Sequence, residues 1–451
     1  MPERYDAVVI GTGPAGRGAA GQLADAGLRV AACERELVGG ECPYWACIPS
    51  KTLLRPPEAR SDARRAAGLG EPEQRFAEVA AYRDEMVRHL DDSAPAEALE
   101  KKGATLYRGP ARVVGPGRVE VGGETLDTDR IVVASGTTAE VPPIDGLEEA
   151  GYWTNREATL LSEVPESVVV LGGGPVGLEL SQFLRRVGAE VTLVHASDRL
   201  LPREDPRVGE LLAQALSEEG IDVRTGVRAT GVERDGDGRR KVSLEDGTAV
   251  SGAELLVAIG RRPRTGDLGL DQVGIELGDG GEVPVDDRCR AGDGVWAIGD
   301  VTGVAAFTHV GTYQARIACA DILGQDARAD YAAIPRVVFS DPEVAAVGLT
   351  AAQARDRGME VATARLDLAE SIARPVTYEQ EPRRQELELV ADRERGVLVG
   401  TWAVAPLAGE WIHQAAMAIK LRAPLEVLRD TVSQFPTYAE GFTNAVRALD
   451  V

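Results

Sequence analysis

Two stretches of the sequence, VVIGTGPAGRGAAGQLADAGLRVAACER at 8–35 and VVLGGGPVGLELSQFLRRVGAEVTLVHA at 169–196, share one pattern. The second begins 161 residues after the first, and the two align without a gap. Each predicts a buried strand, a glycine-rich turn of the form GxGxxG, an amphipathic helix and a second strand. This βαβ pattern is typical of a dinucleotide-binding domain, and its repetition predicts two such domains in the chain.

The spacing of the glycines has a physical reason. The first glycine makes the tight turn, the second lets a pyrophosphate approach the backbone, and the third lets the helix pack on the strand. The free N–H groups at the helix N-terminus then favour phosphate. One GxGxxG is weak because it also occurs as a plain structural turn, but two in matching contexts are strong. The predicted nucleotide-binding glycines are Gly11, Gly13 and Gly16 in the first copy and Gly172, Gly174 and Gly177 in the second.

Further along the chain, a second pair of similar segments completes each nucleotide domain. IVVASGTTAEVPP from Ile131 and LLVAIGRRPRT from Leu255 both predict a buried strand that ends in a glycine turn. GVWAIGDVTG at 294–303 predicts another strand, and the charged, helix-periodic stretch 58–102 predicts a helical excursion from the first domain. Alternating strands and helices without a glycine fingerprint follow from about residue 331. The predicted domains are 1–150 with 291–330, 151–290, and 331–451.

Composition excludes several classes of function. The chain has 451 residues, 44% of them hydrophobic, and a formal net charge of −22. Such a polyanion repels nucleic acid and anionic lipid, so we expect no partner of either kind. No run of 18 apolar residues occurs, and the start MPERYD lacks the features of a signal peptide. We therefore expect a cytoplasmic protein, a compartment in which structural disulfides are rare.

The stretch GGECPYWACIPSK at 39–51 carries two of the five cysteines, Cys42 and Cys47. A regular helix would place their Cα atoms roughly 8.6 Å apart, whereas a disulfide needs less than about 7 Å. We therefore predict a distorted segment, which Pro43 favours. A redox pair is the favoured interpretation; an uncatalytic bridge stays open, and a metal site is disfavoured because no second Cys/His pair lies nearby. Three other cysteines have buried-looking contexts and are predicted core residues: Cys33, Cys289 and Cys319.

Taken together, these motifs resemble the pyridine nucleotide–disulfide oxidoreductases, a flavoprotein family that includes glutathione reductase, dihydrolipoamide dehydrogenase and mercuric reductase. The resemblance rests on GTGPAG at 11–16, the two-cysteine loop followed by Pro49-Ser50-Lys51, GGGPVG at 172–177, AIGD at 297–300, VFSDPEVAAVGLT and a terminal PT-x-x-E. It implies an α/β fold with two Rossmann-like dinucleotide-binding domains and an α+β C-terminal dimerisation domain. It also implies FAD on the first domain, NADPH or NADH on the second, a small-molecule substrate and a homodimer.

The resemblance also assigns roles to single residues. Cys47 would form the thiolate beside the flavin, and Cys42 would attack the substrate. Lys51 matches the family lysine beside flavin N5, and Glu179 matches its ion-pair partner, with an ordinary surface carboxylate as the alternative. Asp300 would hold the ribityl chain, with turn capping as the alternative. The remaining predicted cofactor contacts are Ala134, Gly136, Gly260 and Gly299.

The choice of nucleotide follows from the internal repeat. Glu34 ends the second strand of the first copy, where a carboxylate holds an adenosine ribose. Its counterpart in the second copy is His195, so the carboxylate expected for NADH is missing there. The residues that follow include Ser197, Arg199 and Arg203, which are candidates to meet a 2′-phosphate. The sequence therefore favours NADPH, with NADH possible.

The C-terminal segment departs from the family pattern. Disulfide reductases of the family carry His-Pro-Thr-x-x-Glu there, and the histidine serves as the acid–base for the partner subunit's cysteines. This chain has SQFPTYAEGF at 433–442, so Phe435 stands in place of the histidine while Glu440 is kept. Phenylalanine cannot carry a proton, and we expect the reaction to proceed without that group.

Several reactions are compatible with this departure. The favoured one passes electrons from NADPH through the flavin and the Cys42–Cys47 disulfide to a disulfide or other small electrophile. A family member with a similar cysteine loop and a Phe-Pro-Thr, 2-ketopropyl-coenzyme M oxidoreductase/carboxylase, makes thiolate-assisted C–C cleavage or carboxylation an alternative. Direct reduction of a quinone or metal ion at the flavin is another. A flavin-binding protein with a role in assembly is the alternative outside enzymes.

Overall fold

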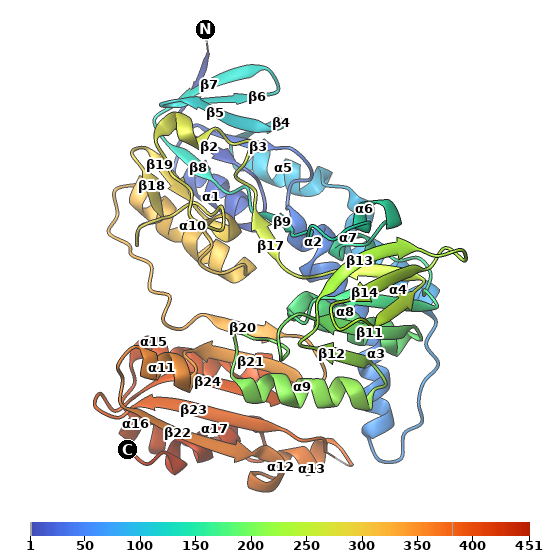
Figure 1. Cartoon of the computed structure of the whole chain (residues 1–451). Coiled ribbons are helices and arrows are strands. Elements are labelled where there is room, and N and C mark those ends of the chain that lie inside the picture. The colour runs from blue at the N-terminus through green and yellow to red at the C-terminus, as the bar shows by residue number, and fades with distance from the viewer. Residues whose placement is uncertain (1, 381) are drawn as a thin grey trace. The chain divides into compact units, whose positions relative to one another are not determined.

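The structure, a computed structural model, describes residues 2–380 and 382–451 (Figure 1). It is a mixed α/β fold with several sheets. The chain divides into two compact units. Unit 1 comprises Met1–Pro49, Ala81–Glu140 and Gly260–Asp330, and unit 2 comprises Ser50–Ala80, Val141–Ile259 and Tyr331–Val451. These units divide the chain differently from the three predicted domains, whose boundaries stay a prediction.

The first glycine fingerprint forms the centre of unit 1. The fully buried strand β2 (Ala7–Ile10) leads into α1 (Pro14–Asp25), which has a proline in its first turn, where the missing N–H has no helical partner to lose. Parallel pairing places β2 between the strand that follows α1 and the strand at Ile131, as predicted. The sheet has six strands in the order β18 (Arg290–Gly292), β19 (Val295–Ala297), β8 (Ile131–Val133), β2, β3 (Val30–Glu34) and β4 (Ala104–Arg108).

Three further features belong to unit 1. The helix α10 (Thr308–Ile322) packs against α1 through small and aliphatic side chains. β9 (Thr137–Ala139) pairs antiparallel with β17 (Arg261–Pro263). A second sheet has the order β1 (Glu3–Tyr5), β7 (Glu124–Thr128), β6 (Arg118–Val121) and β5 (Ala111–Gly115).

The second glycine fingerprint repeats this arrangement in unit 2. β10 (Ser167–Leu171) leads into α8 (Pro175–Val187), which ends at Gly188 with a φ of 116°, a conformation that favours glycine. All strands of this sheet are parallel, in the order β12 (Asp222–Thr225), β11 (Glu190–His195), β10 and β16 (Glu254–Val257). An antiparallel sheet accompanies it: β13 (Ala229–Arg234), β14 (Arg240–Leu244) and β15 (Ala249–Gly252).

The C-terminal part of unit 2 is the predicted α+β segment. Its five-stranded antiparallel sheet has the order β20 (Pro335–Val338), β21 (Glu343–Gly348), β24 (Val397–Ala405), β23 (Glu386–Asp392) and β22 (Val361–Asp367). A common apolar core joins the sheet to helices that follow it in the chain. These helices are α14 (Ala408–Trp411), α15 (His413–Leu421), α16 (Leu425–Arg429) and α17 (Tyr438–Ala448).

The stretch after the two cysteines is helical, as predicted. It contains α3 (Cys47–Arg65), α4 (Phe76–Met86) and α5 (Ser93–Lys101). Leu53 of α3 and Val79 of α4 lie in the same apolar core as Phe183 of α8. Residues 50–80 therefore contribute to the packing of unit 2.

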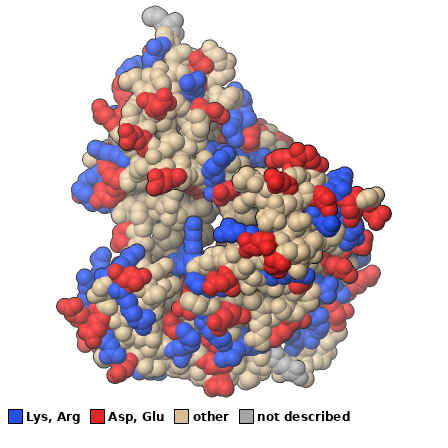
Figure 2. All heavy atoms as spheres, in the orientation of Figure 1, with Lys and Arg blue, Asp and Glu red and all other residues tan. Residues whose placement is uncertain are grey.

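Surface charge is mixed in sign. Figure 2 shows acidic and basic side chains intermingled over the face in view. A continuous basic surface, the usual footprint of a nucleic-acid partner, does not appear on that face. None of the helices in the described ranges is both long enough and apolar enough to cross a membrane.

Candidate functional site

The two loop cysteines lie on either side of a break between helices. α2 (Glu41–Trp45) carries Cys42, and α3 begins at Cys47. Ala46 separates them with φ −133° and ψ −96°, which is far from helical. The predicted distortion is therefore present, although it falls at Ala46 rather than at Pro43, which α2 accommodates in its first turn.

The sulfur atoms contact one another and a threonine. The Cys47 Sγ lies 3.6 Å from the Thr308 Oγ1, and Thr308 is the first residue of α10. A hydrogen bond to Cys47, together with burial, raises the pKa of Cys42 well above its ordinary value. Cys42, Cys47 and Thr308 therefore lie together at the start of α10.

Lys51 and Glu179 form an ion pair within unit 2. The Lys51 Nζ lies 2.6 Å from the Glu179 Oε2, and the same ammonium lies 4.7 Å from the centre of the Phe339 ring. The other carboxylate oxygen of Glu179 accepts a hydrogen bond from the Phe339 N–H at 2.9 Å. Glu179 is buried, so the alternative of a surface carboxylate does not describe its surroundings. Because Lys51 follows Cys47 by one helical turn of α3, the ion pair fixes the rotation of that helix.

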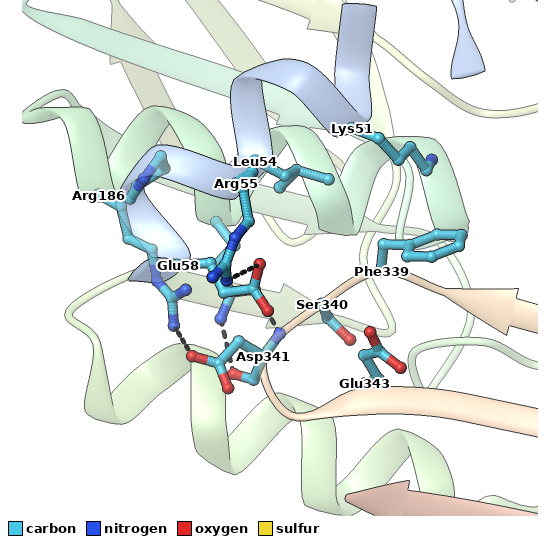
Figure 3. A pocket seen from close by; sticks show the side chains of 11 residues that line it. Lys51, Leu54, Arg55, Glu58, Arg186, Phe339, Ser340, Asp341 and Glu343 are labelled. Carbon is cyan, nitrogen blue, oxygen red and sulfur yellow. Dashed lines mark hydrogen bonds and ion pairs between the residues drawn. The ribbon is translucent and has the colours of Figure 1, made fainter. Parts of the chain in front are cut away.

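One face of α8 holds the chain segment 339–341 along its length (Figure 3). Glu179 binds the Phe339 N–H, and Gln182 both accepts from the Asp341 N–H and donates to the Asp341 carbonyl, each at 2.8 Å. Arg186 then contacts the Asp341 carboxylate at 2.6 Å. Positions i, i+3 and i+7 lie on one helix face, which is why three side chains reach one extended segment.

Asp341 joins three parts of unit 2. Besides Arg186, Arg65 at the end of α3 contacts its carboxylate at 2.8 Å, and Arg383 forms a further ion pair. Burial alone would raise the pKa of Asp341, but Arg383, Arg186 and Arg65 outweigh burial and hold the pKa well below its usual range. The carboxylate is therefore charged throughout the neutral and mildly acidic range.

Replacing this carboxylate is expected to destabilise unit 2. Asp341→Asn leaves three buried or partly buried arginines without their common counter-ion, and we expect the free energy of unfolding at pH 7 to fall by about 3 kcal/mol. Because the folded pKa is depressed, the stabilisation is complete above the unfolded value of 3.8 and is lost as the pH falls below it. Urea unfolding at pH 7 and pH 3 measures both effects.

The matched control is Asp129→Asn, since Asp129 pairs with Arg4 at the surface and both side chains are mostly exposed. We expect a change below about 1 kcal/mol there. An Asp341→Asn protein as stable as the wild type at pH 7, or a difference that persists unchanged at pH 3, would contradict the assignment.

The first glycine loop leaves room for a pyrophosphate. A Cβ at Gly11 would lie 2.4 Å from the Ala134 carbonyl oxygen, and one at Gly16 would lie 1.9 Å from the Gly11 oxygen, so neither position accepts a side chain. A Cβ at Gly13 would meet no atom within 4 Å. Glu34 accepts hydrogen bonds at one carboxylate oxygen from the N–H (2.9 Å) and hydroxyl (2.6 Å) of Thr12. The carboxylate is thus fixed beside the loop.

The second loop has the same steric pattern with a different side chain at its edge. A Cβ at Gly172 or Gly177 would clash with backbone oxygens at 2.3 and 1.9 Å, whereas Gly174 faces open space. His195 takes the place of Glu34: its Nδ1 accepts the Gly173 N–H at 3.1 Å. Burial lowers the pKa of His195, so the ring is neutral at pH 7 and Nε2 carries the hydrogen.

The remaining predicted cofactor residues are spread over both units. In unit 1 the Thr137 hydroxyl donates to the Asp300 carboxylate at 3.0 Å, and burial raises the pKa of Asp300. Gly136 and Gly299 adopt positive φ angles of 68° and 79° in the turns after β8 and β19. Gly260 lies in unit 1, where its carbonyl accepts from the Glu140 N–H, although we predicted it for the second nucleotide domain.

Arg199 follows His195 on the loop after β11. Its guanidinium donates to the Pro202 carbonyl at 3.2 Å and lies 3.8 Å from the Asp198 carboxylate. Neither contact is a strong ion pair, so this arginine is not committed to a structural network. It stays a candidate for contact with a phosphate.

The C-terminal residues lie at the edge of unit 2. Phe435 is 74% exposed in the loop before α17. Glu440 is in the first turn of α17, and its Oε2 is buried without a hydrogen-bond partner in the part of the chain that the structure describes. An exposed aromatic ring and, five residues later in the chain, a buried carboxylate oxygen without a partner indicate a surface that another molecule covers.

Sequence reasoning missed three residues that the structure brings into these sites: Thr308, Gln182 and Asp341. Thr308 has no motif of its own. Asp341 lies within the quoted VFSDPEVAAVGLT, but nothing in the sequence links it to Gln182 or Arg186 on α8. The three remaining cysteines are buried, as predicted. Among the described residues no cluster of three or more His, Cys, Asp or Glu side chains is arranged to hold a metal ion.

The two glycine loops fit dinucleotides. The open space at Gly13 and Gly174 admits a pyrophosphate, and each lies immediately before a helix N-terminus. In unit 1 the Glu34 carboxylate lies beside the loop, where it can accept ribose hydroxyls, and Asp300 offers a buried carboxyl for a polyol. The residues present are therefore suited to hold FAD in unit 1 and a nicotinamide nucleotide in unit 2.

Comparison with known proteins agrees over nearly the whole chain. Residues 5–315 match the family model described as pyridine nucleotide-disulphide oxidoreductase, and residues 334–446 match its dimerisation domain. A dihydrolipoyl dehydrogenase from Thermus scotoductus is 37% identical over 456 residues, covering 99% of this chain and 97% of that protein. A mercuric reductase from Bacillus cereus is 32% identical, covering 99% and 72%.

Solved structures give the same result. The HOCl-induced flavoprotein disulfide reductase RclA from Escherichia coli, in its Cu(II) complex, superposes with a TM-score of 0.88 at 27% identity, covering 99% of this chain and 100% of that one. LpdA from Mycobacterium tuberculosis superposes with a TM-score of 0.88 at 29% identity, covering 99% of both chains.

Proposed function

Because the chain belongs to the pyridine nucleotide-disulphide oxidoreductase family, an FAD-dependent enzyme class, we propose that it reduces a disulfide or another small electrophile with electrons from NADPH. The observation that carries this proposal is the pairing of Cys42 and Cys47 across a helix break, with the Thr308 hydroxyl at the sulfur atoms. When bound, FAD supplies two-electron transfer between the nicotinamide nucleotide and the Cys42–Cys47 disulfide.

The chain's own residues then perform the sulfur chemistry. Cys42 attacks the substrate disulfide, whose S–S bond breaks to release one thiol, and a mixed disulfide forms. Cys47 attacks the Cys42 sulfur, which releases the second thiol and restores the Cys42–Cys47 disulfide. Thr308 orients Cys47. Lys51 matches the family lysine and, held by Glu179, would lie beside the flavin. With Phe435 in place of a histidine, water delivers the protons to the leaving thiols.

The loop around His195 supports NADPH as the electron donor. In the first repeat a carboxylate binds the loop amide, and in the second a neutral imidazole binds the equivalent amide. A neutral imidazole in place of a carboxylate does not repel a 2′-phosphate. Arg199 on the following loop can donate hydrogen bonds to that phosphate. NADH has two free hydroxyls on its adenosine ribose, and position 195 offers them no carboxylate.

A homodimer completes the proposed site. The loop and helices of the C-terminal segment expose large apolar side chains, with Val432 at 91%, Phe435 at 74% and Leu421 at 69%. An apolar surface of this kind is typical of an interface. By resemblance, each subunit donates its Phe435–Glu440 segment to the cysteines of its partner. We propose a cytoplasmic location for this reaction, because NADPH and reduced thiols are supplied there.

Anaerobic titration of the purified FAD-loaded protein tests the proposed function. We expect NADPH to bleach the flavin within seconds, and a long-wavelength band from a cysteine thiolate beside the flavin to appear after two electrons. NADH should require at least about tenfold higher concentration, because it gains no contact from Arg199. Bleaching without the long-wavelength band would exclude electron transfer to the cysteines, and equal use of NADH would overturn the nucleotide assignment.

Reduction of a thiophilic metal ion is the second candidate. Mercuric reductases are among the relatives, and RclA was solved as a Cu(II) complex. Phe435 favours this candidate, because a metal ion bound to two thiolates accepts electrons without a protonated leaving group. A cysteine pair without a histidine suits that chemistry.

A further inference from the structure

A pocket of about 220 Å³ lies in unit 2 between α3, α8 and the segment 339–343 (Figure 3). This volume would hold roughly seven water molecules at about 30 Å³ each. Lys51 lines the pocket at one end and Arg186 with Asp341 at the other, so the two ion-pair groups described above bound it. Leu54, Pro57 and the Phe339 ring contribute apolar surface.

The positive charges in the pocket wall are already neutralised. Lys51 pairs with Glu179 at 2.6 Å, Arg186 with Asp341 at 2.6 Å, and Arg55 with Glu58 at 3.1 Å. These pairs account for the lysine and both arginines of the wall. The wall therefore offers an anionic ligand no free counter-ion.

Among the acidic side chains of the pocket wall, Glu343 differs from Glu58 and Asp341, which pair with arginines. Its Oε2 accepts the Gly409 N–H at 2.8 Å, but no lysine or arginine in the described ranges pairs with it. Burial, followed by the charges of Glu58, Glu410 and Asp341, raises the pKa of Glu343 to about 7. A partly buried carboxylate with acidic neighbours on α3, α14 and the segment before β21 lacks a cation.

We propose that this pocket binds a small organic cation, such as an amidinium or guanidinium compound, with the Glu343 carboxylate as its counter-ion. The cation forms charge-assisted hydrogen bonds to Glu343, and its apolar part packs against Leu54 and Pro57. The proposal does not rest on the proposed redox function, because neither the cysteines nor the glycine loops line this pocket. Since Lys51 lines the same pocket, an occupant would lie next to the Lys51–Glu179 ion pair.

The charge of Glu343 gives the binding a specific pH dependence. A cation binds the ionised carboxylate, so binding at pH 7 should release about half a proton, and binding at pH 9 almost none. Affinity should accordingly rise from pH 6 to pH 8 and then level off. Arg55 and Arg186, which also line the pocket, remain charged over that range and do not contribute.

Titration calorimetry of the purified, FAD-loaded protein with benzamidine tests the proposal. Two buffers of different ionisation enthalpy report the protons released. Glu343→Gln should fold, because its side-chain carbonyl still accepts the Gly409 N–H, and should lower the affinity at least about tenfold and abolish proton release. Glu163→Gln, an exposed position of unit 2, should change neither quantity.

Three results would each overturn the proposal: no binding up to about 10 mM benzamidine, binding of equal strength to Glu343→Gln, or binding without proton release by the wild type at pH 7. Disulfide reduction and flavin bleaching by NADPH are measured separately on the same samples. A protein that fails those assays but binds benzamidine through Glu343 contradicts the proposed function alone.

Discussion

Replacing Cys42 with serine is expected to lower NADPH-driven disulfide reduction by at least about a thousandfold, because the nucleophile that attacks the substrate is removed. Bleaching of the flavin by NADPH should persist, since hydride transfer precedes the sulfur chemistry. Steady-state reduction of a small aromatic disulfide, with single-turnover reduction of the flavin in parallel, measures the two steps. The same loss in both would show that the substitution disrupts the protein rather than the chemistry.

Cys319→Ala is the matched control. Cys319 is buried in the core of unit 1 on α10, the helix that carries Thr308, and its thiol donates to the Ala19 carbonyl at 3.6 Å. We expect disulfide reduction within about twofold of the wild type. If Cys42→Ser instead retains full activity toward a quinone or a metal ion, the acceptor is reduced directly at the flavin, and Cys42 has no part in that reaction.

Phe435→His is expected to raise disulfide reduction by about a hundredfold, since a positioned acid–base contributes that much to proton transfer or more. In the proposed homodimer the new imidazole would lie beside the partner's cysteines. The buried Oε2 of Glu440 is available to orient the ring. The pH–rate profile should gain a limb near pH 6.5, the ordinary pKa of histidine.

Phe435→Leu separates chemistry from packing. Leucine removes the ring but adds no proton carrier, so its rate and pH profile should match those of the wild type. An unchanged rate in Phe435→His, or an equal rise in both variants, would show that position 435 does not limit proton transfer to the leaving thiol. A fall in metal-ion reduction alone in Phe435→His would favour the second candidate function.

Local rules were enough to predict the two nucleotide-binding cores. The tight turn of a GxGxxG motif requires a positive φ at its first glycine, and Gly11 and Gly172 have φ values of 96° and 120°. The segments at Ile131 and Leu255 were predicted as buried strands because both read as continuous apolar runs, and each pairs in parallel with the first strand of its glycine fingerprint. The break between Cys42 and Cys47 followed from the geometry of a helix.

Contacts between distant segments were not predictable in this way. Asp341 reads as an ordinary turn residue until α3, α8 and the segment at 383 converge on it. Thr308 gains its place at the sulfur atoms only because α10 packs on α1. Nor does any spacing rule reveal that Glu343 lacks a cation, since that depends on which basic residues other acids have already engaged.

The hydrogen bond from each glycine loop to the side chain at the end of the following strand has an evolutionary consequence. A carboxylate at Glu34 and an imidazole at His195 accept the equivalent loop amide, so either side chain satisfies the backbone. The Glu34 carboxylate also accepts the Thr12 hydroxyl, whereas the second loop has Gly173 at the equivalent position and presents no hydroxyl. A side chain at position 195 can therefore change between carboxylate and imidazole and keep its hydrogen bond to Gly173, which leaves selection there free to act on the coenzyme.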